Sequence, residues 1–106
     1  MTIKLFLTLA TGLSIVTVQA QANEVALALA KKNNCAACHA VDQKLVGPSW
    51  RSIGQKYAGD TGAEARLVLK AKKGGVGVWG QIPMPPNVTA KDADLKAIVQ
   101  YALSLK

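Results

Sequence analysis

The chain has 106 residues, half of them hydrophobic, and its 13 Lys and Arg against 6 Asp and Glu give a formal net charge of +7. This length suits one small domain, and two cysteines with one histidine are too few for a zinc site built from four Cys or His ligands. This excess of basic residues favours binding to an acidic protein partner or an anionic surface. The alternative is that it only keeps the chain soluble. Nucleic acid is not expected, because the first residues indicate export.

The first 22 residues have the pattern of a secretory signal peptide. Lys4 gives a short basic start, residues 5–18 are mostly apolar but short for a bilayer, and Ala20-Gln21-Ala22 is a small-x-small cleavage pattern. We expect cleavage after Ala22, with Ala20 as the alternative, so that residues 1–22 are signal and 23–106 form the domain. An uncleaved N-terminal anchor is the interpretation that this pattern disfavours. Removal of 22 residues from 106 leaves 84, a size that often needs a cofactor to complete its core.

Asn23 is predicted to cap the first helix of the domain, which would run to about Asn33. Val25, Ala28 and Leu29 have helical spacing, so we expect them to share the buried face of this helix.

The next segment, Cys35-Ala36-Ala37-Cys38-His39, is a C-x-x-C-H sequence, the attachment pattern of c-type haem. Two intervening residues let one turn of chain present both sulfurs to one porphyrin edge, and the adjacent imidazole can then ligate the iron. Because c-type haem is attached outside the cytoplasm, the motif and the export signal together indicate a bacterial periplasm.

Other interpretations of the two cysteines are weaker. A thioredoxin-like site needs alternating strands and helices, which the pattern lacks. Zinc would have to recruit carboxylates from elsewhere in the chain. A disulfide between Cys35 and Cys38 would close so small a ring that it would stabilise little.

Two short helices are predicted in the middle of the chain. After a loop over residues 40–48, Ser49 would cap a helix that runs through Tyr57 and ends at Gly59. A third helix is expected over residues 63–73, since two glycines follow it. Residues 74–88 are rich in Gly and Pro, and we predict no regular structure there.

Thr89 is predicted to cap the last helix through a capping box with Asp92, and the helix would run to about Ser104. Its buried side would carry Leu95, Ile98, Val99 and Ala102. The sequence therefore predicts an all-α domain of about four short helices, with irregular chain in the two places where a haem would need it.

A haem iron held by one His has a sixth coordination position, and the group that occupies it distinguishes one class of haem protein from another. An open position permits chemistry on O2 or peroxide, whereas a Met thioether closes it and raises the reduction potential. Met1 leaves with the signal peptide, so Met84 is the only methionine of the mature chain. It lies between Pro83 and Pro85, whose fixed φ stiffens the backbone around a ligand. The alternative is a Met that fills a gap in the core.

Four segments carry a family resemblance: residues 35–39, Val-Gly-Pro at 46–48, Gly-Val-Trp-Gly at 77–80 and Ile-Pro-Met-Pro-Pro-Asn at 82–87. In this order they resemble the short bacterial class I monohaem cytochromes c, small periplasmic carriers named by their α-band wavelength. The resemblance covers essentially the whole mature chain. It implies the class I cytochrome c fold, in which the first and last helices cross around one covalently bound haem.

The resemblance also assigns the direct contacts with the haem. It implies that Cys35 and Cys38 form the two thioethers, that His39 is the proximal iron ligand and that Met84 is the distal one.

Four further residues would support these contacts. By the same resemblance, the Pro48 carbonyl accepts the Nδ1 proton of the proximal imidazole, and Asn87 hydrogen-bonds near the distal sulfur. Trp79 would donate its indole N–H to a haem propionate. Lys70 falls where relatives often carry a basic residue near that propionate. Trp50, in contrast, is expected to be an ordinary core residue.

We therefore expect a monomeric electron carrier that transforms no substrate itself. Its donor would be a redox protein such as a quinol-oxidising complex, and its acceptor one such as a terminal oxidase or a nitrite reductase. The apolar residues expected to contact partners are Leu45, Val46, Ile82 and Pro83. The lysines expected around the haem pocket are Lys31, Lys32, Lys44, Lys70, Lys72 and Lys73.

Two other functions stay open at this point. One is a haem peroxidase or gas sensor with an open distal site, and the other is a thiol-disulfide oxidoreductase that uses the two cysteines.

Overall fold

The computed structural model describes residues 14–106, and the side chains of residues 18–106. Its helices are α1 (Ser14–Lys32), the short 3-10 helix η1 (Cys35–Ala37), α2 (Trp50–Lys56), α3 (Ala63–Lys73) and α4 (Asp92–Ser104). Two strands, β1 (Gly75–Gly77) and β2 (Gly80–Met84), form an antiparallel hairpin. The all-α prediction with about four helices is confirmed. Among the described residues, no helix is both long and apolar enough to cross a membrane.

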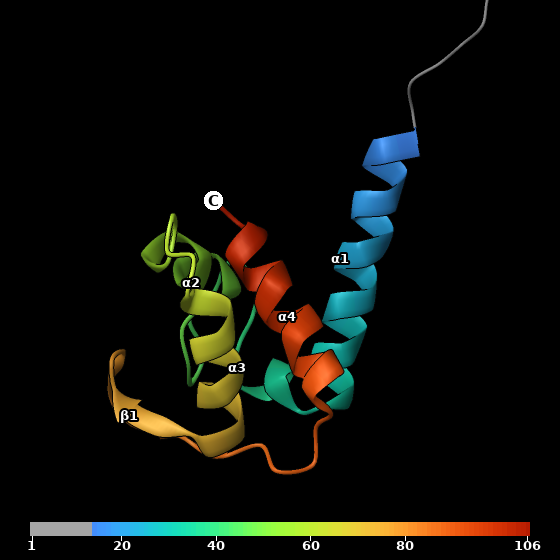
Figure 1. Cartoon of the computed structure of the whole chain (residues 1–106). Coiled ribbons are helices and arrows are strands. Elements are labelled where there is room, and N and C mark those ends of the chain that lie inside the picture. Colours follow the sequence, from blue (N-terminus) through green and yellow to red (C-terminus); the bar gives the residue numbers. More distant parts are fainter. Residues whose placement is uncertain (1–13) are drawn as a thin grey trace, which may run out of the picture.

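Helix α4 is the element against which the other three α-helices pack (Figure 1). Its apolar residues recur at helical spacing and so form one stripe along the helix. The four residues predicted to be buried are buried, and Tyr101 joins them: Leu95, Ile98, Val99, Tyr101 and Ala102. Burial of this stripe supplies the main hydrophobic stabilisation of the helices.

The predicted capping box before α4 is wrong. The helix begins at Asp92 after Lys91, and no side-chain cap forms there. Asn87 takes part instead, since its Oδ1 accepts a hydrogen bond from the Ala90 N–H at 3.1 Å. Asp92 and Asp94 in the first turn still favour the helix, because acidic groups there complement its dipole.

Helix α1 differs from the prediction in its start and in its buried face. It runs unbroken from Ser14, so Asn23 lies in the helix interior and caps nothing. The buried residues are Ala26 and Ala30, while Val25 is 56% exposed. Two alanines one turn apart let the backbones of α1 and α4 approach closely, and small size, more than hydrophobicity, selects this face.

The beginning of α1 stands clear of the rest of the molecule (Figure 1). The predicted signal peptide ends in this part of the helix, and its first 13 residues lie outside the described part of the chain. At the other end, Asn34 adopts a left-handed conformation with φ 64°. Asn tolerates this conformation better than most residues, and it turns the chain out of α1 and into the C-x-x-C-H segment.

The predictions for α2 and α3 are confirmed. Ser49 caps α2, with its Oγ accepting a hydrogen bond from the Ser52 N–H at 3.0 Å. Helix α3 has the predicted bounds and ends at Gly74, whose φ of 71° favours glycine.

The hairpin is a correction, because residues 74–88 were predicted to be irregular throughout. Gly77 and Gly80 have φ values of 109° and 114°, and these conformations allow the chain to reverse between the strands. Pro83 fits in β2 because an edge strand of a two-stranded hairpin tolerates a missing N–H. The glycines that disfavour long strands therefore build a short hairpin.

The contact between α2 and the end of α4 depends on Gly54. A Cβ on Gly54 would lie 2.3 Å from the carbonyl oxygens of Ala102 and Leu105. We expect Gly54→Ala to lower the free energy of unfolding by about 1–3 kcal/mol, the usual cost of overpacking, although Ala is the better helix former. Denaturant unfolding measures this loss. The neighbouring exposed Gln55→Ala is the control, and equal stability of the two variants would contradict the close contact.

Candidate functional site

A cavity of about 510 Å³ lies between the C-x-x-C-H segment, helices α3 and α4, and the hairpin with the loop that follows it. Leu95, Ile98 and Val99 of α4 give it an apolar wall. The predicted site residues that line it are Cys35, Cys38, His39, Val46, Pro48, Lys70, Trp79, Ile82, Pro83, Met84 and Asn87. The fold thus brings together segments that lie between residues 33 and 102 of the sequence.

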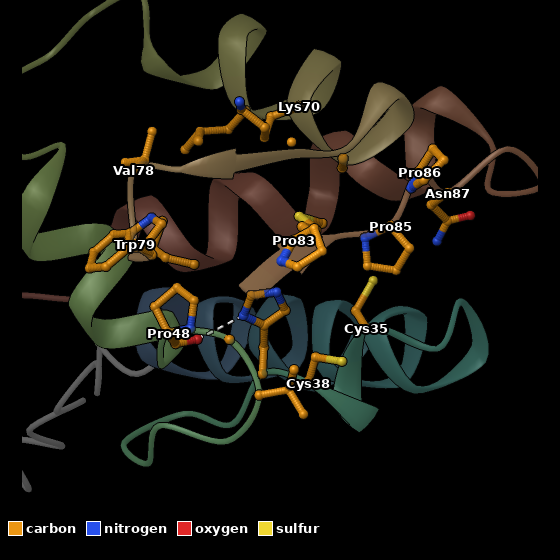
Figure 2. A pocket seen from close by; sticks show the side chains of 18 of the residues that line it. Cys35, Cys38, Pro48, Lys70, Val78, Trp79, Pro83, Pro85, Pro86 and Asn87 are labelled. Carbon is orange, nitrogen blue, oxygen red and sulfur yellow. Dashed lines mark hydrogen bonds between the residues drawn. The ribbon is translucent and has the colours of Figure 1, made fainter. Parts of the chain in front are cut away.

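The two cysteines lie close together on one side of the cavity (Figure 2). Both are free thiols, and the N–H groups of Cys38 and His39 bond to the Cys35 carbonyl at 3.1 and 3.0 Å. Burial raises the pKa of the Cys35 thiol above its ordinary value. Reactive cysteines of thiol oxidoreductases have lowered pKa values instead, so the environment of Cys35 is not that of such a nucleophile.

His39 is buried, and its ring has a fixed orientation. Its Nδ1 lies 2.7 Å from the Pro48 carbonyl oxygen, the interaction drawn as a dashed line in Figure 2. A carbonyl can only accept, so Nδ1 carries the proton and Nε2 keeps its lone pair for a metal. Gly47 leaves room for this arrangement, since a Cβ there would lie 2.7 Å from the His39 Cε1.

Trp50 is a site residue that the sequence prediction assigned only to the core. Its ring stacks on the imidazole of His39, with 4.6 Å between centroids and 28° between planes. Both side chains are buried, at 7% and 8% exposed. The sequence signal that could have found this contact is the place of Trp50 in the chain. Trp50 begins helix α2 two residues after Pro48, whose carbonyl contacts His39.

Met84 ends strand β2, where it pairs with Gly75 of β1 and is half-buried at the cavity. The chain around it passes very close to the end of α3. A Cβ on Gly74 would lie 2.5 Å from the Met84 carbonyl oxygen and 2.8 Å from the Pro86 nitrogen. Glycine at the end of α3 therefore permits the path of the methionine segment.

Asn87 anchors this segment to three other parts of the molecule. Its backbone N–H donates to the Ala71 carbonyl at 2.9 Å, and its Nδ2 donates to the Asn33 carbonyl at 2.9 Å. Its Oδ1 accepts from Ala90 before α4. The bond to Asn33 uses one of the two Nδ2 hydrogens. A bond to the Met84 sulfur would use the other.

Trp79 and Lys70 lie along the opposite side of the cavity from the cysteines (Figure 2). Trp79 is in the turn of the hairpin and is 42% exposed. The Lys56 Nζ lies 5.5 Å from its ring centroid, a cation–π contact for which the sequence holds no signal. The Lys70 side chain covers Gly75, whose added Cβ would meet the Lys70 Nζ at 2.6 Å.

The predicted docking residues are exposed at or near the cavity. Leu45, Val46 and Ile82 are 44%, 53% and 66% exposed, and Pro83 is also exposed. Val46, Ile82 and Pro83 line the cavity, whereas Leu45 lies outside the lining. We call these four residues the apolar rim.

The lysines divide into two groups. Lys44 and Lys70 line the cavity. Lys32 and Lys72 lie outside the lining and instead approach α4, at 4.0 Å from Asp94 and 2.8 Å from Asp92. Lys31 and Lys73 are also outside the lining.

The donor set fits a haem. Two neighbouring thiols, an imidazole with its Nε2 available and a thioether all line one largely apolar cavity. Such a set supplies covalent attachment and axial ligands to an iron porphyrin, and the apolar wall suits the flat apolar body of the group.

Comparison with known proteins gives the same family. Residues 26–106 match the family model described as cytochrome c. The chain is 56% identical over 78 residues to cytochrome c-552 of Nitrosomonas europaea, covering 74% of this chain and 76% of that protein. It is 46% identical over 78 residues to cytochrome c-551 of Pseudomonas aeruginosa, covering 74% of each.

Solved structures agree with the fold. The crystal structure of wild-type N. europaea cytochrome c552 superposes with a TM-score of 0.73 and 55% identity, covering 76% of this chain and 99% of that chain. The class 1 cytochrome MtoD from Sideroxydans lithotrophicus superposes with a TM-score of 0.62 and 30% identity, covering 76% of this chain and 92% of that one. The chain belongs to the cytochrome c family, among the small class I electron carriers with one covalently attached haem c.

Proposed function

We propose that this chain carries single electrons between redox proteins of the periplasm, with Cys35 and Cys38 as the covalent attachment points and His39 and Met84 as axial ligands. The observation that carries the proposal is that all four side chains line one cavity. When bound, the haem supplies a one-electron couple between ferric and ferrous iron.

The chain's own residues hold this geometry in both states. The Pro48 carbonyl fixes the tautomer of His39, and a neutral imidazole held in this way is a stronger ligand. Asn87 holds the methionine segment and would donate its second amide hydrogen to the Met84 sulfur. The apolar side chains of α4 line the cavity, so a haem bound there would be in contact with apolar groups on that side and would need less rearrangement of solvent on electron transfer.

Trp79 and Lys70 would bind the haem propionates from the hairpin side. An indole N–H and an ammonium are suitable donors for carboxylates. Both residues line the cavity on the side away from the thiols (Figure 2), which is where propionates lie when the vinyl edge is bound to the cysteines.

Export of residues 23–106 after cleavage at Ala22 completes the proposal. The match to the family model begins at residue 26, after the proposed cleavage site. The donor would be a quinol-oxidising complex, and the acceptor a terminal oxidase or nitrite reductase. The apolar rim would contact these partners, with the monomer as the working form.

The axial role of Met84 is tested by Met84→Ala and Met84→Leu. Both remove the sulfur, and Leu conserves the volume, so a change shared by both reflects ligation and not packing. We expect loss of the weak red charge-transfer band of the ferric protein, a lower reduction potential and new binding of CO. Absorption spectra and a redox titration measure these. If native protein already binds CO strongly, the open-site peroxidase or sensor is the better assignment.

Cys35→Ala with Cys38→Ala tests covalent attachment and the structural need for it. We expect no haem on a denaturing gel and much reduced helicity by circular dichroism, because the cavity would lack the group that fills it. The control is Ala36→Ser with Ala37→Ser, two exposed positions between the thiols. A stable, helical double Cys variant without haem would contradict the structural part of this prediction.

Electrostatic steering of a partner toward the cavity is tested by removing one positive charge, either at the cavity or away from it. Lys44→Gln at the cavity should reduce the rate of association with an acidic redox partner modestly and weaken its salt dependence. Lys72→Gln removes the same charge from a position outside the cavity lining, beside Asp92, and should have a smaller effect. Stopped-flow rates across ionic strength measure both, since screening limits the field to about 8 Å at physiological salt. Equal effects of the two variants would mean that net charge alone matters.

Docking by the apolar rim is tested by Ile82→Glu. The side chain is 66% exposed, so the change should leave folding intact and impair electron transfer even at high salt, where steering is screened. Val25→Glu is the control, because Val25 is 56% exposed on α1 and lies outside the cavity lining. The same stopped-flow assay measures both variants, and equal losses would argue against a local docking patch.

A further inference from the structure

Three features of the chain restrict the His39 ring from different directions. The Pro48 carbonyl holds Nδ1 at 2.7 Å. The backbone at Gly47 lies against the Cε1 edge, where a Cβ would come within 2.7 Å. The Trp50 indole covers one face, with 4.6 Å between ring centroids.

The first two contacts leave one motion open. A single hydrogen bond fixes the position of Nδ1, but the ring can still tilt about the line that joins it to the carbonyl. The stack of the imidazole face on a buried indole, with 28° between the planes, opposes that tilt, because rotation separates the two surfaces or makes them collide. Trp50 cannot easily move away, since it is 7% exposed and belongs to the core cluster with Ala30 and Ile98.

The stack also has an electrostatic consequence. The face of an indole carries partial negative charge and attracts positive charge. An imidazole bound to ferric iron is more positive than one bound to ferrous iron, since the ferric ion withdraws more electron density. The indole face therefore stabilises the ferric state more than the ferrous state, and its presence lowers the reduction potential.

We propose that Trp50 is a positioning residue for His39, which fixes the plane of the proximal imidazole and lowers the reduction potential of the carrier. The proposal rests on the proposed axial role of His39. It gives Trp50 a part in setting the potential, in addition to its part in the core.

The test compares Trp50→Phe, Trp50→Leu and a core control in the holoprotein. Phe keeps an aromatic ring whose face carries less partial negative charge than that of an indole, whereas Leu keeps only an apolar side chain. The control is Tyr101→Leu, because Tyr101 is buried in the same cluster but does not line the cavity. Redox titration gives the potential, electron paramagnetic resonance of the ferric protein reports the field of the axial ligands, and denaturant unfolding gives stability.

We expect the potential to rise in the order native protein, Phe variant, Leu variant. The paramagnetic spectrum should change in the Leu variant and stay close to native in the Phe variant. Tyr101→Leu should lose stability while keeping the native potential and spectrum. If the Leu variant does not fold, the partial rise in the Phe variant still decides the question.

Two results would overturn the proposal, and they are distinguishable. A less stable Leu variant with the native potential and spectrum would show that Trp50 only packs. A native ferric protein without the low-spin signal of two strong axial ligands would instead remove the assignment of His39 and Met84, and with it the basis for a role of Trp50.

Discussion

The fold depends on a cavity that its own side chains do not fill. Leu95, Ile98 and Val99 belong to the helix that holds the others together, and all three also line the cavity of about 510 Å³. A domain of this size buries little apolar surface, so the group that occupies the cavity completes the same core that the helices form. Cofactor binding is therefore expected to be coupled to folding in this chain, since a group that binds only the folded state stabilises it.

The positions of the two proposed axial side chains, His39 and Met84, depend mainly on contacts with the backbone. Pro48 contributes a carbonyl, Gly47 contributes space, and Gly74 lets the Met84 segment pass within van der Waals contact of α3. Asn87 then ties that segment to α1, α3 and the start of α4. Contacts of this kind do not depend on a charge at the cavity, so we expect them to persist in both oxidation states of a one-electron carrier.

Local signals predicted much of the fold. A serine cap fixed the start of α2, Gly74 fixed the end of α3, and helical spacing identified the buried stripe of α4. The hairpin was missed because Gly and Pro were treated only as breakers, although Gly77 supplies the backbone conformation that a tight reversal needs. Asn is common at helix caps, which favours a start at Asn23, but the helix already begins at Ser14 and Asn23 lies in its interior.

In the site, too, local sequence patterns predicted some contacts and not others. The spacing of Cys35, Cys38 and His39 is itself the attachment pattern of c-type haem, so the sequence alone predicted this part of the site. The Pro48 contact was expected only from the family resemblance, and no sequence signal predicted the stack of Trp50 on His39 or the approach of Lys56 to Trp79. Stacking and cation–π contacts depend on how two separate elements meet, which pattern and propensity do not encode.

The charge distribution follows from the packing of α4. Asp92 and Asp94 favour the start of that helix, and they draw Lys72 and Lys32 to them. The paired lysines contribute little field beyond their surroundings, because opposite charges so close together largely cancel at a distance. Lys44 remains at the cavity, next in sequence to Leu45 and Val46 of the apolar rim, while Lys70 would be paired with a haem propionate in the proposed complex. A positive charge beside the proposed docking surface would suit a partner that is attracted from solution, docked briefly and released, since charge at the edge speeds encounter while a small apolar contact keeps residence short.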